Sequence, residues 1–387
     1  MRKIIFAILV LTCLKAPQSF AQGTQYYLED NLNDALKVRV YVVAGPQAKG
    51  QVQDSLYHSV DHAREALARF DPNNPKSELG SINQRKTRGN YMLSGELAEA
   101  MAAALDVAKL TGGTFDFTGD AGEGNFKSVR LKASSGELTL KQDNLFLDLK
   151  NIQAGILADL IVQDLTRAGW KNCLVKIGSV FVSRGSDVNG PWKIPVFTPT
   201  NKLATRVLFY KAKEDLGSAT FPFYKEQVQV MDPRTKQPSS TDLKSATIFA
   251  RSGAVSEGLA TALYIMGAEG SKNFLNRNKK FRGVLGTGDG EFVHVPAWQV
   301  SSRKQAEASE VPETPKVQET PKIKETKKIR EAFRREETPR MQAAPKIKEK
   351  PVQEKPAKVK KRTPTPAPDE ESLEPEEKQA HSSASTL

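Results

Sequence analysis

The sequence predicts an α+β fold over residues 22–300, followed by a disordered tail over residues 301–387. Segments with helical and with strand periodicity alternate irregularly in the first part, which favours α+β over a doubly wound sheet. All 26 glycines lie before residue 301, whereas the tail holds 20 basic and 16 acidic residues, 11 of the 22 prolines and one aromatic residue. Such a tail lacks the apolar surface that would offset the entropy of ordering.

The first 21 residues are typical of an export signal. A basic pair precedes an apolar run over residues 4–14, and Ser19 and Ala21 have the spacing of a signal-peptidase site. The run is too short for a membrane span, because crossing about 30 Å of hydrocarbon requires about 20 helical residues. We therefore expect an exported, periplasmic protein, with a lipoprotein anchored through Cys13 as the alternative.

Periodicity places the first elements of the folded part. A Val-rich alternation over 37–43 indicates a strand. Apolar residues recur at helical spacing over 52–70, where Asp71-Pro72 ends the pattern. A second helix is predicted over 96–110, between a capping Ser94 and the stop signal Gly112-Gly113.

The later elements follow from the same patterns. We predict strands within 129–149, with a hairpin turn at 134–136 and alternating leucines over 145–149, and then at 173–182, 192–197, 206–211, 227–231 and 246–250. Helices are expected from 153 to near 169, over 257–266 and over 271–276. A hairpin that pairs 282–285 with 292–295 completes the fold, with the glycines of 286–290 in its turn.

The formal net charge of +12 does not indicate nucleic-acid binding. The tail carries +4 of it, from 20 basic and 16 acidic residues, and the rest is spread without a basic block or interleaved aromatic platforms. The tail also repeats Lys/Glu/Pro-rich units such as ETPKVQ and ETPKIK, which are typical of an extended spacer. Tethering of the domain to the membrane or envelope is an alternative role.

Three segments could carry chemistry, and each has a structural alternative. His58 and His62 have the spacing of a metal-binding pair, but no HExxH or Cys cluster accompanies them, so a solvated helix face is favoured. The segment GGTFDFT, at 112–118, either lets a ligand approach the backbone or ends a helix before a strand. Glu257 and Thr261 lie one helical turn apart, so their oxygens could face a hard cation such as Mg²⁺. The alternative for Glu257 is stabilisation of a helix N-terminus.

Five blocks in a fixed order resemble the ApbE family of FAD:protein FMN transferases over residues 30–298. They are FDPNNPKSELGSIN (70–83), TGGTFDFT (111–118), LDLKNIQAGILAD (147–159), VMDPRTKQP (230–238) and SATIFARSGAVSEGLATALYIMG (245–267). The resemblance implies an ApbE-like domain of mixed sheet and helices, as one unit or as two subdomains with a cleft. It further implies that FAD binds with Mg²⁺ at its pyrophosphate, and that FMN passes to a threonine hydroxyl of an acceptor protein with release of AMP.

The resemblance also implies a set of site residues. Those expected to bind FAD are Phe70, Thr114, Phe115, Asp116, Asp159 and Met231, and those expected to bind the metal are the side chains of Glu257 and Thr261 and the carbonyl of Leu157. Phe70 suits the flat apolar face of a flavin ring. Phosphoryl transfer depends mostly on positioning and electrostatics, and no catalytic acid or base is assigned.

The chain departs from the family pattern at the reacting end of the site. Ala154 and Ile156 stand where the family usually has lysine and tyrosine, and Gly178-Ser179 stands for a glycine pair. Gln229 stands for a histidine and cannot act as a general base at neutral pH. Glu257 stands for an aspartate, and its extra methylene moves the carboxylate. The alternative function is therefore that of an FAD-binding protein impaired in transfer, or of an FAD pyrophosphatase.

Overall fold

The computed structural model describes residues 23–118, 125–199, 205–212, 215–222, 230–288 and 291–296. All of them belong to one compact unit, Met1–Ser309, so the division into two subdomains is not found among the described residues. The predicted export signal, Cys13, Gln229 and the tail lie outside these residues. No helix in the described ranges has both the length and the apolarity that a membrane span requires.

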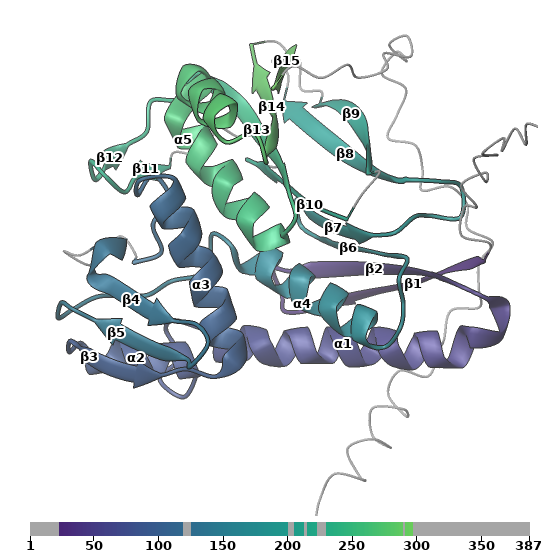
Figure 1. The fold of residues 1–387 in the computed structure, drawn as a ribbon, viewed down its shortest axis with the longest axis horizontal. Helices are drawn as coiled ribbons and strands as arrows, with labels where there is room; N and C mark the ends of the chain where they lie inside the picture. Colours follow the sequence, from purple (N-terminus) through teal and green to yellow (C-terminus); the bar gives the residue numbers. More distant parts are fainter. Residues whose placement is uncertain are drawn as a thin grey trace, which may run out of the picture. The chain divides into compact units, whose positions relative to one another are not determined.

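An antiparallel sheet of eight strands forms the centre of this unit (Figure 1). Its order is β1 (Thr24–Asn31), β2 (Lys37–Ala44), β6 (Cys173–Ile177), β7 (Val180–Arg184), β10 (Leu216–Phe221), β13 (Leu243–Ala250), β14 (Arg282–Thr287) and β15 (Glu291–Val295). The alternation in β2 buries Val38, Val40 and Val42, which pack in the main core. One face of the sheet is therefore apolar and needs a cover.

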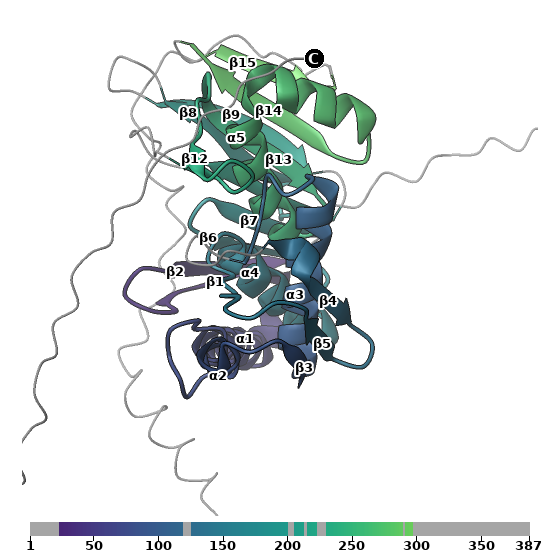
Figure 2. The ribbon, with the colours of Figure 1, turned by 90° about the vertical axis from the view of Figure 1, so that its left-hand side faces the viewer.

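Helices cover this face. The longer ones are α1 (Lys49–Arg69), α3 (Gly95–Leu110), α4 (Gln153–Arg167) and α5 (Gly253–Arg277), and a short α2 (Glu78–Arg85) follows α1. Figure 2 shows α4 beside β6 and β7, which it contacts, and α5 contacts β10 and β13. The helices also pack on one another, α1 with α4, α4 with α5, and α3 with α5. The main core lies between these helices and the sheet.

The opposite face is covered in part by the hairpin of β8 (Trp192–Pro199) and β9 (Thr205–Ala212). Trp192, Ile194 and Val196 are buried on β8 and form a second core with Leu174 and Phe181 of the sheet. Two small sheets complete the described residues. They are β3 (Gly89–Met92), β5 (Glu137–Leu140) and β4 (Val129–Lys132), in that order, and the pair β11 (Met231–Asp232) and β12 (Gln237–Pro238).

The α+β class is confirmed, and most predicted elements are found within a few residues of their predicted ends. The predicted strand at 145–149 is wrong. The leucines at 145, 147 and 149 are all buried, but this segment pairs with no strand. The Asn83 side chain instead accepts from the Leu147 amide and donates to its carbonyl, both at 2.9 Å. These side-chain hydrogen bonds, with a backbone bond from the Asp148 amide to the Phe117 carbonyl at 2.8 Å, satisfy an extended segment that looks like a strand by its sequence.

Other boundaries also differ from the prediction. Residues 173–182 form two strands rather than one, because the chain reverses at Gly178, whose φ is 56°. The helices predicted at 257–266 and 271–276 belong to one element, α5, interrupted at Gly267 with φ 72°. Of the strand predicted at 227–231, residues 227–229 lie outside the described ranges. Among the strands and α-helices of the described residues, the sequence patterns missed five, namely β1, α2, β3, β10 and β12.

Candidate functional site

The first turns of α4 and α5 meet at two glycines. A Cβ atom on Gly155 would lie 2.4 Å from backbone atoms of Gly253 and Ala254. A Cβ atom on Gly253 would lie 3.0 Å from the carbonyl oxygen of Gly155. Only glycine at position 155 allows the two backbones to approach this closely, because no rotamer change can relieve a clash with main chain. The crossing fixes how the two helix N-termini face each other.

Asp159 of α4 caps the N-terminus of α5. Its carboxylate accepts hydrogen bonds from the Ser252 hydroxyl at 2.7 Å, the Gly253 amide at 2.8 Å and the Ala254 amide at 3.0 Å. Ser252 is itself the N-cap of α5 and accepts from the Val255 amide at 3.3 Å. Three of the amides that a helix N-terminus leaves without an intrahelical partner are thereby satisfied.

Glu257 of α5 reciprocates by capping α4. Its Oε2 accepts from the Gly155 amide, the third residue of α4, at 2.7 Å. The N-cap residue of α4 is Ile152, which offers no side-chain acceptor of its own. Each helix therefore provides the carboxylate that the other helix needs. We name this arrangement, made of Asp159, Glu257, Gly155 and the 252–254 segment, the reciprocal cap.

Both carboxylates of the reciprocal cap hold protons more tightly than usual. Desolvation raises the pKa of Asp159, although hydrogen bonds from Ala254, Gly253 and Ser252 and the charge of Arg184 oppose the rise. Desolvation, followed by the charge of Asp159, raises the pKa of Glu257 to about 7 against the Gly155 hydrogen bond. Two acids close together in a poorly hydrated place favour a nearby positive charge or a shared proton.

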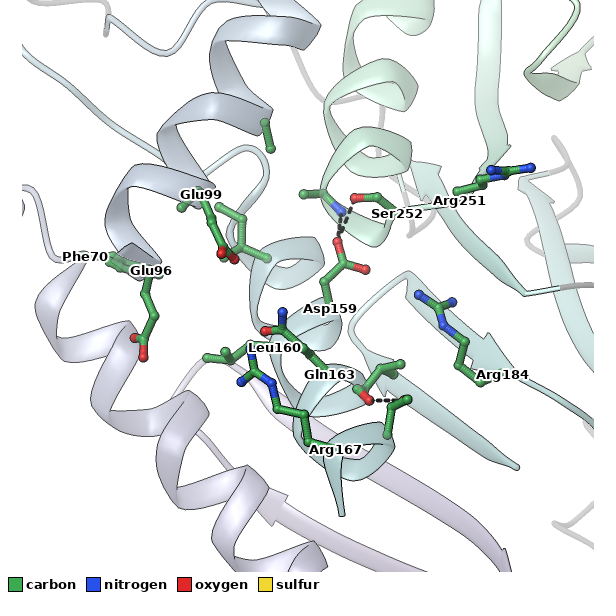
Figure 3. Close-up of a pocket in the computed structure, with 16 residues that line it drawn as sticks. Phe70, Glu96, Glu99, Asp159, Leu160, Gln163, Arg167, Arg184, Arg251 and Ser252 are labelled. Atoms are coloured by element: carbon green, nitrogen blue, oxygen red, sulfur yellow. Dashed lines mark hydrogen bonds between the residues drawn. The ribbon is translucent and has the colours of Figure 1, made fainter. Parts of the chain in front are cut away.

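A cavity of about 460 Å³ opens beside the reciprocal cap (Figure 3). Its lining comes from the end of α1, from α3, α4 and β7, and from the start of α5. The apolar part of the lining includes Phe70, Ala100, Ala103, Ile156, Leu160 and Ala254, and the charged part consists of Glu96, Glu99, Asp159, Arg167, Arg184 and Arg251. An apolar surface with a few convergent polar groups is typical of a small-molecule site.

The predicted FAD residues fall into two groups. Phe70 and Asp159 line the cavity, but the Phe70 side chain is only 1% exposed, so the protein itself covers most of its ring. Thr114 and Phe115 are also buried and do not line the cavity, and the ring of Phe115 lies 3.5 Å from the position of a Cβ on Gly258 of α5. The Phe115 ring thus packs on the helix that carries Glu257.

The other two residues of the second group lie near the GGTFDFT segment. Asp116 holds the local chain, accepting from the Thr118 amide at 2.9 Å and the Phe126 amide at 3.0 Å. Met231 is 40% exposed on β11. The β11–β12 hairpin approaches the same segment, because Arg234 Cγ lies 3.9 Å from the position of a Cβ on Gly113. The segment therefore serves both as a helix stop and as part of a partly exposed surface.

The predicted metal ligands lie on the two crossing helices. Glu257 and Thr261 are one turn apart on α5, and the Thr261 hydroxyl donates to the Glu257 carbonyl at 3.3 Å. Leu157 is fully buried within α4, where backbone carbonyls accept helical hydrogen bonds. No group of three or more His, Cys, Asp or Glu side chains suited to a metal occurs in the described ranges. The Gly155 amide donates to Oε2 of Glu257, so Oε1 does not take part in this hydrogen bond. Oε1 and the Thr261 hydroxyl are oxygen ligands of the kind that Mg²⁺ prefers.

His62 does not lie on a solvated helix face, as the sequence had suggested. Its Nδ1 is 2.7 Å from Asp164 of α4, and its Nε2 is 2.7 Å from Glu96 of α3, which also pairs with Arg69. Both ring nitrogens are thus occupied by carboxylates on two neighbouring helices. His62 joins α1, α3 and α4 at the edge of the cavity that Glu96 lines.

This bridge makes the stability of the protein depend on pH. Burial lowers the pKa of His62, but the hydrogen bonds and charges of Asp164 and Glu96 together raise it above the ordinary value of 6.5. The bridge therefore stabilises the folded state fully below pH of about 6.5, and this contribution is lost as the pH rises through the folded-state pKa.

We expect His62→Gln to lower the free energy of unfolding by about 1 kcal/mol at acidic pH, and by less at alkaline pH. Urea unfolding of both proteins across this range measures the difference. His58→Gln is the control, because His58 lies one turn earlier on α1, where its ring stacks on that of His62 with the centroids 6.4 Å apart, but it forms no hydrogen bond or ion pair within the described chain. This variant therefore removes the ring contact and keeps the bridge. A loss that is equal at both pH values would contradict the charged bridge.

The architecture is that of flavin transferases. The structure of "Flavin Transferase ApbE from Vibrio cholerae" matches with a TM-score of 0.60 at 19% identity, over 70% of this chain and 97% of that chain. The apo form of the Pseudomonas stutzeri flavinyl transferase ApbE matches with the same TM-score and identity, over 70% of this chain and 94% of its own. At this identity, the likeness establishes the fold.

Sequence relatives point the same way. A model of the ApbE family matches residues 121–285. The FAD:protein FMN transferase of Haemophilus influenzae is 23% identical over 240 residues, which are 52% of this chain and 69% of the relative. The one from Salmonella typhimurium is 21% identical over 309 residues, which are 70% of this chain and 87% of the relative. The family model, the relatives and the shared fold all support the ApbE family for this chain.

Proposed function

We propose that this protein transfers FMN from FAD to a threonine hydroxyl of an acceptor protein in a Mg²⁺-dependent reaction that releases AMP. The observation that carries this proposal is the cavity lined by Phe70 and Asp159 beside the reciprocal cap. It lies in a chain whose relatives are FAD:protein FMN transferases. The cavity offers an apolar wall for a ring system, and α5, whose start lies beside it, carries oxygen donors for a cation.

The proposed reaction is a phosphoryl transfer. The acceptor hydroxyl oxygen forms a bond to the phosphorus of the FMN half, and the bond from that phosphorus to the bridging oxygen breaks. AMP leaves with the bridging oxygen, and the hydroxyl proton passes to solvent. Mg²⁺, when bound, would supply positive charge that neutralises the diphosphate as charge develops on the leaving group. Glu257 and Thr261 would hold this ion, and Asp159 would keep α5 in place so that both side chains stay aligned.

We further propose that the reaction takes place outside the cytoplasm, after removal of the first 21 residues. The basic and apolar pattern of this segment supports export. The segment 301–387 would then act as a spacer or an envelope tether, in line with its repeated Lys/Glu/Pro units. The acceptor would be an exported protein with an accessible threonine.

A second candidate is an FAD-binding protein that does not transfer FMN, or one that hydrolyses FAD. One observation favours it, because the Glu257 carboxylate already accepts the Gly155 amide and is only partly free for a cation. The absence of a histidine at position 229 of the sequence points the same way, since glutamine cannot take the hydroxyl proton.

Incubation of the mature chain with FAD, Mg²⁺ and an acceptor carrying a flavinylatable threonine is expected to give a fluorescent acceptor band on a denaturing gel. The band should disappear when EDTA removes the metal, and when the acceptor threonine is replaced by alanine. An unlabelled acceptor together with bound, intact FAD would favour the binding protein. Release of FMN and AMP without labelling would favour the pyrophosphatase.

A further inference from the structure

The backbone amides in the first turns of α4 and α5, beside the cavity, already donate hydrogen bonds to carboxylates of the protein. The Gly253 and Ala254 amides of α5 bond to Asp159, and the Gly155 amide of α4 bonds to Glu257. A helix N-terminus normally attracts phosphate through such amides. The first turns of both helices also contain no lysine or arginine, since they read QAGI and GAVS. Positive charge that the protein's own side chains offer to a diphosphate, besides the proposed cation, must therefore come from another part of the cavity wall.

Arg184 is placed to supply this charge. It ends β7, where its carbonyl accepts from the Trp192 indole at 3.0 Å and its Nη1 donates to the Ser183 carbonyl at 3.0 Å. The side chain is only 26% exposed, so its charge is less screened than that of a surface arginine. Figure 3 shows its guanidinium directed toward Asp159. The side chain is thus held at the cavity wall rather than spread over the surface.

Two carboxylates lie near Arg184, and neither is a strong competitor for a ligand. The Asp159 carboxylate already accepts three hydrogen bonds from the 252–254 segment, and the ion pair with Asp215 is long. Asp215 Oδ2 lies 3.7 Å from the Arg184 Nε, and the Asp215 side chain is 62% exposed. An ion pair of this length with an exposed acid contributes little and gives way to a better acceptor. A phosphate offers a guanidinium two oxygens at once, which is the geometry that arginine prefers.

The other two arginines of the cavity are less suitable. The Arg167 side chain is 63% exposed at the last turn of α4 and pairs with Asp164 at 3.5 Å. The Arg251 side chain is exposed, and in Figure 3 its guanidinium turns away from Asp159 and Ser252. Of the three, Arg184 alone combines partial burial with a direction toward the reciprocal cap.

We propose that Arg184 binds a phosphate of the dinucleotide, at the side of the cavity opposite to the end of α1, and so positions the diphosphate beside Glu257. This inference rests on the proposed function, because it takes FAD as the ligand. The Arg184 guanidinium would bind the phosphate in place of the helix amides, which already donate to Asp159 and Glu257. It is a substrate-positioning residue and makes no bond to the acceptor hydroxyl.

Binding of FAD to the full mature chain, measured by titration calorimetry at low and at high salt, tests this role. Arg184→Gln is expected to weaken FAD binding at low salt by about tenfold, the usual effect of losing a charge-assisted hydrogen bond. The variant should also show a smaller loss of affinity on addition of salt than the wild type shows, because one fewer charge contacts the phosphate. Arg184→Lys should keep the salt dependence and part of the affinity, because lysine retains the charge but not the two parallel hydrogen bonds of a guanidinium.

Arg277→Gln is the matched control, because Arg277 is an exposed arginine in the last turn of α5 and its removal changes the net charge equally. Affinity of Arg184→Gln within twofold of the wild type would overturn the inference while leaving the proposed function intact. A tenfold loss that is equal at low and high salt, with a lowered melting temperature, would also overturn it and assign Arg184 a structural role. Failure of the wild type to bind FAD would instead contradict the proposed function itself.

Discussion

Asp159→Ala is expected to lower the free energy of unfolding by about 3 kcal/mol, because it leaves a buried set of donors without an acceptor. The Asp159 carboxylate receives the Ser252 hydroxyl and the amides of Gly253 and Ala254, all within 3.0 Å. Alanine replaces none of these bonds. The start of α5 should therefore fray, and the Glu257 side chain should lose its fixed position.

Urea unfolding of the variant and the wild type measures this loss. Asp106→Ala is the matched control, because Asp106 is an exposed aspartate within α3, and a surface substitution of this kind changes stability by about 0.5 kcal/mol or less. Asp159→Asn should be intermediate, since an amide keeps one acceptor oxygen where the carboxylate has two. Equal, small effects of Asp159→Ala and Asp106→Ala would show that the cap does not hold α5 in place.

Local signals predicted the helices well where both ends were marked. α3 begins after Ser94, whose side chain accepts from the Leu97 amide, and ends before Gly112, whose φ is 61°. Both features were read from the sequence, because capping residues and left-handed glycines act within a few positions of the helix end. The missed α2 also has a capping serine, Ser77, which accepts from the Gly80 amide. Its eight residues are too few for a clear apolar stripe.

The sequence patterns did not predict strand β10, because tertiary packing rather than local strand propensity determines its residues. Its sequence, LGSATF, has small side chains where strands usually carry branched ones. A Cβ atom on Gly217 would lie 2.4 Å from the carbonyl carbon of Ser252, so the strand must be small where α5 begins. A contact between residues this far apart in the chain leaves no local pattern.

The site was predicted only in part, because its contacts also join residues far apart in the sequence. The spacing of Glu257 and Thr261 correctly predicted both on one helix, and stabilisation of a helix N-terminus was the alternative role for Glu257. The helix it caps is α4, however, through Gly155, which lies 102 residues away in the sequence. No local spacing predicts such a partner. Arg184 was missed because a single arginine at a strand end belongs to no motif, and only the fold brings it to the cavity.

Gly155→Ala is expected to be among the most damaging single-methyl changes in this protein, lowering the free energy of unfolding by about 3 kcal/mol or more. The added Cβ would meet the carbonyl group of Gly253 and the amide of Ala254 at 2.4 Å. These are backbone atoms, so the helices themselves must separate. Separation would stretch the bond between the Gly155 amide and Glu257, and those that Asp159 makes with α5. A methyl group would thereby break both halves of the reciprocal cap.

Gly50→Ala is the control for this substitution. Gly50 lies in α1, with no atom within 4 Å of an added Cβ, and alanine there should stabilise the helix by about 0.5–1 kcal/mol. Thermal and urea unfolding of both variants, together with their FAD affinity, separate two possibilities. Loss of stability and of FAD binding in Gly155→Ala alone would show that the close helix crossing shapes the cavity. Wild-type stability and affinity in this variant would mean that α4 and α5 can move apart freely, and the cap would then have no part in positioning Glu257.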